Sequence, residues 1–397
     1  MRWLRQGFLS RPDGEQASAG FHLSIHAGED YSHPLSGLRH IDETVRFSEM
    51  RSGDRLGHAL ALGIDPHKWV NRHGDMILPI DEHLDNLVWA WHYACELSAR
   101  LPVANHVVPI LQRKIARAAV YGAWLCELSQ LEQACPPNCA CYKATKKIRA
   151  EAAQLNPDVL FNAWLLRRNC YHMFQQASQA DFPDSRINSA VPDIERLKAI
   201  SNHADEDGYS PEYLYLKRHL HLKGQCQNLP LALVQTEATA QVRDPMQTDE
   251  LHHHIFYDVE SDEELIFMGA LQDYLLEKYD QKGLIIETNP SSNVYIARLE
   301  NHAEHPIFRW HPPDESMLHQ GAKYNKFGLR RGPIRVLINT DDPGIMPTTL
   351  RTEYALLRDA AIDQGFSRTT TEEWLERIRC FGMSQFHRNH LPVFIES

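Results

Sequence analysis

Several short apolar runs in this 397-residue sequence end in side chains that could do acid–base or metal chemistry. Imidazole nitrogens and carboxylate oxygens are zinc ligands, and zinc lowers the pKa of a bound water toward neutrality. A partly desolvated carboxyl group has a raised pKa and can donate a proton at neutral pH. The side chains of these types at the ends of the runs are His26, Glu29, His58, Glu287, Asp341 and Asp342.

Five of these residues suggest separate chemical roles. We expect His26 and Asp341 to bind a metal ion, because a histidine and a carboxylate at the mouths of parallel strands suit zinc. Glu29 lies three residues after His26, close enough to face the same cavity and donate a proton. His58 could orient or deprotonate a water, and Asp342 could hold that water or a substrate nitrogen. Considered singly, each residue also fits an ordinary role as a core histidine or a turn cap.

The elements that would position these residues are short strands and helices in two outer segments of the chain. We expect helices over residues 41–50, 350–364 and 371–379, and strands over residues 21–25, 55–58, 284–286 and 334–338. In parallel α/β folds, the carboxyl ends of the strands form the face where ligands bind. Because four strands each end in a polar cluster, we expect one shared active-site face.

The middle of the chain is expected to be a mainly helical insertion. Apolar side chains recur at helical spacing over residues 84–95, 111–125 and 159–174. Ser261 and Glu264 have the spacing of a capping box at the start of another helix. The expected domains are barrel segments at residues 1–65 and 283–397, with an assembly or partner-docking insertion at residues 66–282.

Composition excludes some classes of function. The 41 Lys and Arg against 52 Asp and Glu give a net charge of −11, which argues against coating nucleic acid by bulk electrostatics. No run of eighteen or more apolar residues occurs, so we expect no membrane span. Eight mostly isolated cysteines favour reduced thiols and a cytoplasmic protein. Cys135, Cys139 and Cys141 could form a structural zinc site, against the alternative of free thiols in a turn.

The polar clusters belong to five longer motifs: His26-Ala27-Gly28-Glu29, Arg55-Leu56-Gly57-His58, Glu287 with Asn289-Pro290-Ser291-Ser292-Asn293, Thr340-Asp341-Asp342-Pro343, and Asn301-His302 with His305-Pro306-Ile307. In order and content, these motifs resemble those of the adenosine/AMP deaminase family, within the metal-dependent hydrolase superfamily. The resemblance implies a zinc-dependent (β/α)8 TIM barrel that hydrolyses the 6-amino group of adenosine or an adenine nucleotide. This chain would carry the last four strand motifs of that barrel.

The resemblance also implies a role for each matching residue. His26 and Asp341 would be zinc ligands, and Glu29 would protonate the purine ring. His58 would handle the attacking water. Asp342 would hold that water or the purine, and Gly28 would lie against the substrate.

The sequence departs from the family pattern in two ways. No His-x-His pair, which supplies two further zinc ligands in the family, precedes His26. We therefore expect the first four strands to come from a longer chain or from another polypeptide; His219 and His221 are either a surface pair or replacement ligands. The alternative is a catalytically silent scaffold subunit or an inactive C-terminal fragment.

The second departure is the large insertion. It resembles that of the deaminase subunit of the RADAR anti-phage defence system. This resemblance implies a homo-oligomer and an ATPase partner.

Overall fold

The chain divides into two compact units, which are described separately. The computed structural model describes residues 22–125, 139–179, 190–201, 209–222, 230–240 and 255–389. The first unit combines Met1–Trp69 with Met268–Ser397, and the second is Val70–Phe267. The first unit therefore joins the two segments that carry the polar clusters.

A parallel four-stranded sheet forms the centre of the first unit. Its order is β1-β2-β6-β7, so strands from the two ends of the sequence lie side by side. The α/β class is as expected, but four strands in one open sheet are not a closed (β/α)8 barrel, and the barrel stays a prediction. The strands are β1 (Ser24–Ala27), β2 (Arg55–His58), β6 (Ile285–Thr288) and β7 (Arg335–Ile338).

The register of this sheet aligns the ends of its strands. Ala27 pairs with His58, and Thr288 pairs with Ile338. Because all four strands are parallel, their carboxyl ends share one edge of the sheet. The strand cores are short buried apolar runs such as Ile285-Ile286, which are typical of a parallel sheet.

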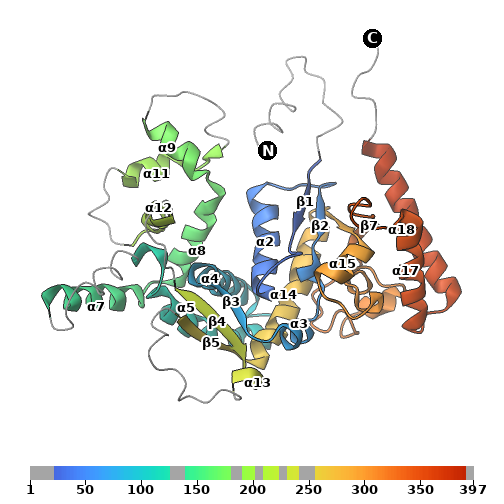
Figure 1. Ribbon diagram of the computed structural model, residues 1–397, viewed down its shortest axis with the longest axis horizontal. Helices are drawn as coiled ribbons and strands as arrows, with labels where there is room; N and C mark the ends of the chain where they lie inside the picture. Colours follow the sequence, from blue (N-terminus) through green and yellow to red (C-terminus); the bar gives the residue numbers. More distant parts are fainter. Residues whose placement is uncertain are drawn as a thin grey trace, which may run out of the picture. The chain divides into compact units, whose positions relative to one another are not determined.

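Helices from both sequence segments of the first unit pack against this sheet. Helix α2 contacts β1, and α17 and α18 contact β7 (Figure 1). Helix α2 begins earlier than expected, because Pro34 occupies its first turn and the His33 side chain accepts a hydrogen bond from the Leu35 backbone N–H. The helices are α2 (Pro34–Phe47), η1 (Leu60–Leu62), α15 (Pro290–Ile296), η5 (His302–Glu304), α16 (Ile307–Trp310), η6 (Glu315–Leu318), α17 (Leu350–Asp363) and α18 (Arg368–Asn389).

Two further helices are α3 (Pro66–His73) and α14 (Asp262–Gln281). Within the first unit, Gln272 of α14 donates hydrogen bonds to the backbone carbonyls of Ala61 and Ile64. These bonds hold the segment that follows β2. The capping box predicted at Ser261 and Glu264 is confirmed, with the Glu264 carboxylate 2.9 Å from the Ser261 backbone nitrogen.

The second unit is mainly helical, but it contains a sheet that the sequence analysis did not predict. Strand β4 pairs antiparallel with β3 and parallel with β5. Short apolar runs such as Leu231–Thr236 cannot be distinguished from buried helix by periodicity alone, which explains the omission. The strands are β3 (Met76–Pro79), β4 (Leu231–Thr236) and β5 (Ile255–Glu260).

The helix expected over residues 159–174 is broken in the structure. Asn169 lies at the break, where its side-chain Nδ2 donates to the Leu166 carbonyl and its Oδ1 accepts from the Asp193 backbone N–H. Side-chain bonds of this kind compete with the helical pattern. The helices of this unit are α4 (Ile80–Leu97), α5 (Pro102–Ala119), η2 (Ala123–Leu125), α7 (Ala140–Ala152), α8 (Pro157–Leu165), η3 (Leu166–Arg168), α9 (Tyr171–Gln179), α11 (Ile194–Ser201), α12 (Pro211–Leu222) and α13 (Glu237–Ala240).

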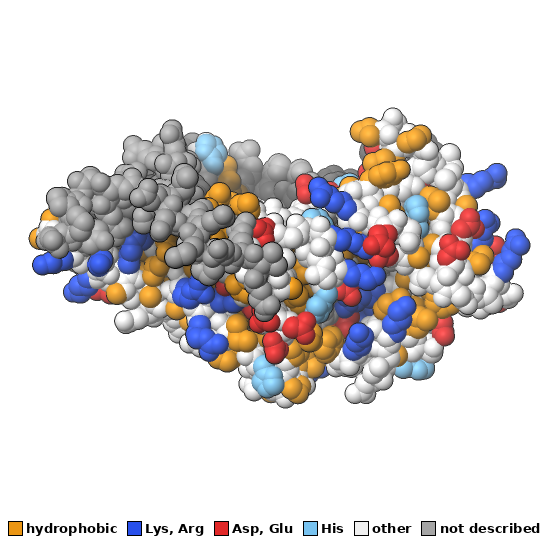
Figure 2. Space-filling view, turned by 60° about the horizontal axis from the view of Figure 1, so that its bottom comes forward, with side chains coloured by type: hydrophobic (Ala, Val, Ile, Leu, Met, Phe, Trp, Pro, Cys, Tyr) orange, Lys and Arg blue, Asp and Glu red, His pale blue; other side chains and the backbone are white. Residues whose placement is uncertain are grey.

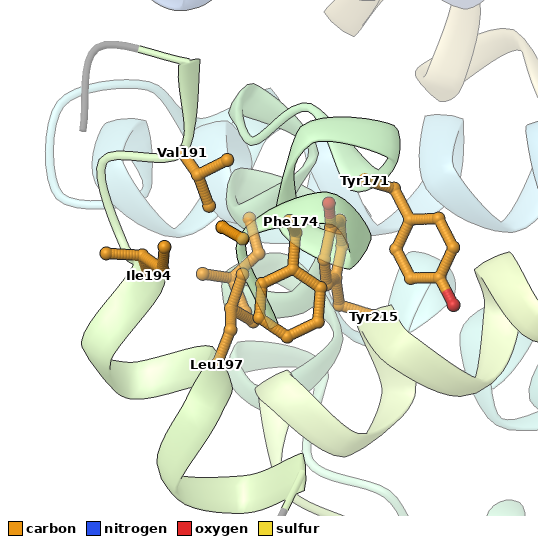
Figure 3. Close-up of a cluster of buried hydrophobic side chains, with 8 residues drawn as sticks. Tyr171, Phe174, Val191, Ile194, Leu197 and Tyr215 are labelled. Atoms are coloured by element: carbon orange, nitrogen blue, oxygen red, sulfur yellow. The ribbon is translucent and has the colours of Figure 1, made fainter. Parts of the chain in front are cut away.

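Two features stabilise the second unit internally. Side chains from α9, α11 and α12 point toward one another in an apolar cluster around Phe174, Leu197 and Tyr215 (Figure 3). A buried ionic group lies near the sheet, where Lys114 Nζ is 2.7 Å from Glu264 Oε1 and 3.4 Å from Asp258 Oδ2. Breaking such a group by removing its cation is strongly destabilising.

The surface carries charges of both signs. Basic and acidic side chains occur among hydrophobic ones on the face drawn in Figure 2. None of the helices in the described part of the chain is both long enough and apolar enough to cross a membrane.

Candidate functional site

Strand β1 and the loop that follows it place His26 and Glu29, respectively, at the carboxyl edge of the parallel sheet. The His26 side chain is 49% exposed, and its Nδ1 lies 3.8 Å from Glu29 Oε1. On β2, Gly57 makes room for the imidazole, because a Cβ at that position would lie 2.2 Å from His26 Cδ2. The local sequence therefore keeps the His26 ring over its neighbouring strand.

Two residues at this edge have left-handed backbone conformations, which residues other than glycine rarely adopt. His58, the last residue of β2, has φ 59°, and Asp341, in the loop after β7, has φ 62°. Left-handed conformations at residues other than glycine are uncommon, cost about 1–3 kcal/mol, and cluster at functional sites. The side chains of these two strained residues lie 3.6 Å apart, measured from His58 Nε2 to Asp341 Oδ2.

Four of the predicted site residues meet at this edge. His58 Nε2 lies 2.9 Å from Glu29 Oε2 and 3.6 Å from Asp341 Oδ2. The His26 and His58 rings are 4.6 Å apart, edge to face. Ligand atoms of His26, Glu29 and His58 all lie within 4.8 Å of one another. The site thus combines two imidazoles and two carboxylates, which are donor types that zinc prefers.

Helix α15 supplies polar contacts to the same edge. Ser292 donates its hydroxyl to Asp341 Oδ2 at 2.6 Å, which fixes one oxygen of that carboxylate. The helix start is held from outside by Glu353, which accepts a hydrogen bond from the Ser291 backbone N–H at 2.8 Å. This arrangement orients Asp341 relative to His58.

The structure places Asp342 and Gly28 apart from these contacts. Asp342 is exposed, and its Oδ1 accepts a hydrogen bond from the Gly344 backbone N–H, so it caps its own turn. Gly28 is buried, with φ 69°, and its carbonyl accepts a hydrogen bond from the Ala61 backbone N–H. Gly28 therefore has a clear structural role, and the substrate contacts of both residues stay predictions.

Glu287 lies on β6, in the sheet rather than beyond it. Its Oε1 accepts a hydrogen bond from Asn339 Nδ2 at 2.8 Å, and its Oε2 lies 3.8 Å from an Arg55 guanidinium nitrogen. These contacts link β6 to β2 and to the loop after β7. Glu287 therefore connects the strands beside the site.

Sequence reasoning assigned no role to three residues that surround His58. Asn293 Nδ2 lies 2.7 Å from His58 Nδ1, and Asn289 Nδ2 lies 3.3 Å from His58 Nε2. His305 lies behind Asn293, with its Nε2 2.9 Å from Asn293 Oδ1. Burial, aided by the neighbouring histidines His302 and His58, lowers the pKa of His305 to about 3. All three residues lie within the motifs given above, but only the fold shows that Asn289 and Asn293 contact His58 and that His305 contacts Asn293.

The other proposed metal residues lie in the second unit. Cys139 is half-buried, whereas Cys135 and the side chain of Cys141 lie outside the described residues. His219 stacks on Tyr171, with ring centroids 4.5 Å apart. His219 therefore has an aromatic packing role within its own unit.

No known family model and no curated protein matches this sequence.

Proposed function

We propose that this chain carries part of a zinc-dependent deaminase that hydrolyses adenosine or an adenine nucleotide to the inosine product and ammonia. The observation that supports this most strongly is the meeting of His26, Glu29, His58 and Asp341 at the carboxyl edge of a parallel sheet. These are the residues to which the family resemblance assigns chemistry. The proposal places the reaction in the cytoplasm.

The donor set fits a zinc ion in part. His26 and Asp341 would be the ligands from this chain, and their side chains are accessible from the strand ends. The remaining ligands would come from the first four barrel strands, in a longer chain or another polypeptide. When bound, zinc lowers the pKa of a water toward neutrality.

The protein side chains would divide the remaining work. Glu29 would donate a proton to the purine ring, which makes the carbon bearing the amino group more electrophilic. His58, 2.9 Å from Glu29, would orient or deprotonate the water that attacks this carbon. Asp342 would hold the water or a purine nitrogen from the adjoining loop. The water oxygen first adds to this carbon, and the carbon–nitrogen bond then breaks; of the two protons of the water, one leaves with the amino group as ammonia and the other returns to the Glu29 carboxylate.

A second candidate function is assembly without catalysis. The outer face of the three-stranded sheet in the second unit exposes apolar side chains: Ile77 is 58%, Leu231 43% and Val259 39% exposed. Exposed apolar surface of this kind is typical of protein contacts. In this alternative the second unit supports a homo-oligomer, with the ATPase of an anti-phage defence system as a partner.

Variants of the acid and the histidine test the proposed reaction in the complete assembly. Conversion of adenosine, AMP and ATP to their inosine products should fall about 10²–10⁴-fold in Glu29→Gln and in His58→Ala, since the first removes the proton donor and the second removes the side chain that handles the attacking water. The exposed Glu315→Gln is the matched control and should keep full activity. Turnover that is unchanged in both site variants would remove them from the mechanism. An assembly that binds purines but never deaminates them would favour the scaffold alternative.

A further inference from the structure

A buried path of hydrogen bonds leads from a backbone amide to the candidate active-site histidine. His305, Asn293 and His58 are each at most 1% exposed. The contacts are Ile307 N to His305 Nδ1 at 3.0 Å, His305 Nε2 to Asn293 Oδ1 at 2.9 Å, Asn293 Nδ2 to His58 Nδ1 at 2.7 Å, and His58 Nε2 to Glu29 Oε2 at 2.9 Å. Each contact restricts which atom of the next side chain along the path carries the hydrogen.

The proton of His305 has only one position. Its Nδ1 accepts a hydrogen bond from the Ile307 backbone N–H, so Nδ1 carries no hydrogen. Burial lowers the pKa of this histidine to about 3, which keeps the ring neutral at physiological pH. A neutral imidazole with an unprotonated Nδ1 must carry its hydrogen on Nε2. His305 therefore donates from Nε2.

The orientation of the Asn293 carboxamide follows from its donors. Its Oδ1 lies 3.0 Å from the Asn289 backbone nitrogen, 3.0 Å from the Thr288 hydroxyl and 2.9 Å from His305 Nε2. The backbone N–H and the His305 N–H can only donate, so the atom that faces them must be the carbonyl oxygen. The amide nitrogen of Asn293 therefore faces His58 and donates to its Nδ1.

We propose that Asn293 is a positioning residue that fixes His58 in the tautomer with its proton on Nε2, and that His305 holds Asn293 in the required orientation. His58 then acts as a hydrogen-bond donor through Nε2. Of the two roles considered for His58, orienting the water is compatible with this tautomer. Deprotonating the water is not, because Nδ1 is occupied by Asn293 and Nε2 already carries hydrogen. The catalytic meaning of this inference rests on the proposed function, whereas the tautomer itself does not.

His58 contacts Glu29, Asn293 and Asn289, and its contact with Asn289 is the longest of these three. In the opposite tautomer, His58 Nε2 would accept a hydrogen bond from Asn289 Nδ2 at 3.3 Å. The protonated Nδ1 would then lie 2.7 Å from Asn293 Nδ2, so that two donors would face each other. Asn289 Oδ1 is buried without a hydrogen-bond partner among the described atoms. Turning the Asn289 amide by half a rotation satisfies this oxygen and gives the His58 Nε2–H a second acceptor. The shorter contacts therefore decide the tautomer.

Nitrogen NMR of the full chain tests this inference directly. In metal-free protein labelled with 15N-histidine, the protonated and unprotonated ring nitrogens are distinguished by chemical shift, and His58 is assigned by comparison with His58→Ala. We expect His58 to be protonated on Nε2 and not on Nδ1. We expect His305 to show the same tautomer without titrating between pH 5 and 8. Protonation of His58 on Nδ1, or titration of His305 in this range, would overturn the inference in the unmodified protein.

The variant Asn293→Asp provides the second test. Its carboxylate oxygen in place of Nδ2 would accept a hydrogen bond from His58 Nδ1, whereas the amide nitrogen donates one to that atom. We expect His58 to gain a proton on Nδ1 in this variant. The exposed Asn301→Asp makes the same chemical change and should leave the His58 signals unchanged. A His58 pattern that is unchanged in folded Asn293→Asp contradicts the inference. Deaminase assays distinguish this inference from the proposed function. If His58 has the expected tautomer but the assembly shows no turnover, only the proposed function is contradicted. If the assembly turns over substrate but His58 has the other tautomer, only this inference is contradicted.

Discussion

Replacing Gly28 by alanine should destabilise the loop that carries the candidate acid. Gly28 has φ 69°, and an alanine Cβ would lie 2.3 Å from Ile41 Cδ1 and 3.1 Å from the Gly37 carbonyl oxygen. A left-handed backbone costs a side-chain-bearing residue about 1–2 kcal/mol. Overpacking against a buried helix costs about 1–3 kcal/mol more. The expected loss for Gly28→Ala is therefore about 2–5 kcal/mol.

Hydrogen exchange measured by mass spectrometry can detect this loss locally. Peptides that cover β1 and α2 report the free energy of opening of this region without requiring two-state unfolding of the whole chain. Gly321→Ala is the matched control, because Gly321 has φ 81° and nothing lies within 4 Å of its Cβ position. Its loss, measured in peptides that cover residue 321, should be limited to the backbone cost of about 1–2 kcal/mol. Equal losses in the two variants would refute the packing of this loop on Ile41.

Three further variants test other parts of the account. Gly57→Ala should displace the half-exposed His26 ring and so weaken zinc binding in a competition titration. The free energy of unfolding should change by no more than about 1 kcal/mol. Unchanged zinc affinity would contradict the placement of His26. Because the folded-state pKa of His305 is about 3, its unfolded form binds a proton first as the pH falls below 6.5. His305 should therefore cost about 2 kcal/mol of stability at pH 5, at about 1.4 kcal/mol per unit, and His305→Phe should lack this pH dependence in urea titrations. Lys114→Met should lower the free energy of opening of β5, measured by hydrogen exchange, by about 3–5 kcal/mol, because it removes the cation that contacts the buried Glu264 carboxylate; protection that is unchanged would mean that Lys114 contributes little.

The strands of the parallel sheet could be predicted because each is a short apolar run that ends in a polar cluster. The clusters at His26, His58 and Asp341 are then brought together by parallel pairing, which is a general property of such sheets. The expected strand at residues 21–25 begins instead at Ser24, since periodicity locates an element better than it locates its ends.

Other features could not be predicted because they depend on contacts between distant residues. The path from His305 through Asn293 to His58 joins side chains that are 12 and 235 residues apart. The sheet of the second unit pairs Leu78 with Ala232, and neither segment shows a strand alternation that is strong enough to exclude a helix. The break at Asn169 likewise depends on Asp193, which lies on another part of the chain.

The number of zinc ions bound per chain tests the central claim most directly. The wild type, Asp341→Ala and Asp342→Ala, each in the complete assembly that includes the remaining barrel strands, would be loaded with zinc, freed of excess metal and analysed for metal content. We expect the wild type and Asp342→Ala to hold one more zinc per chain than Asp341→Ala, because Asp341 lies beside His58 whereas Asp342 caps its own turn. Zinc at the cysteine cluster would contribute equally to all three. The same metal content in all three proteins would contradict the account of this edge of the sheet as a zinc-dependent active site.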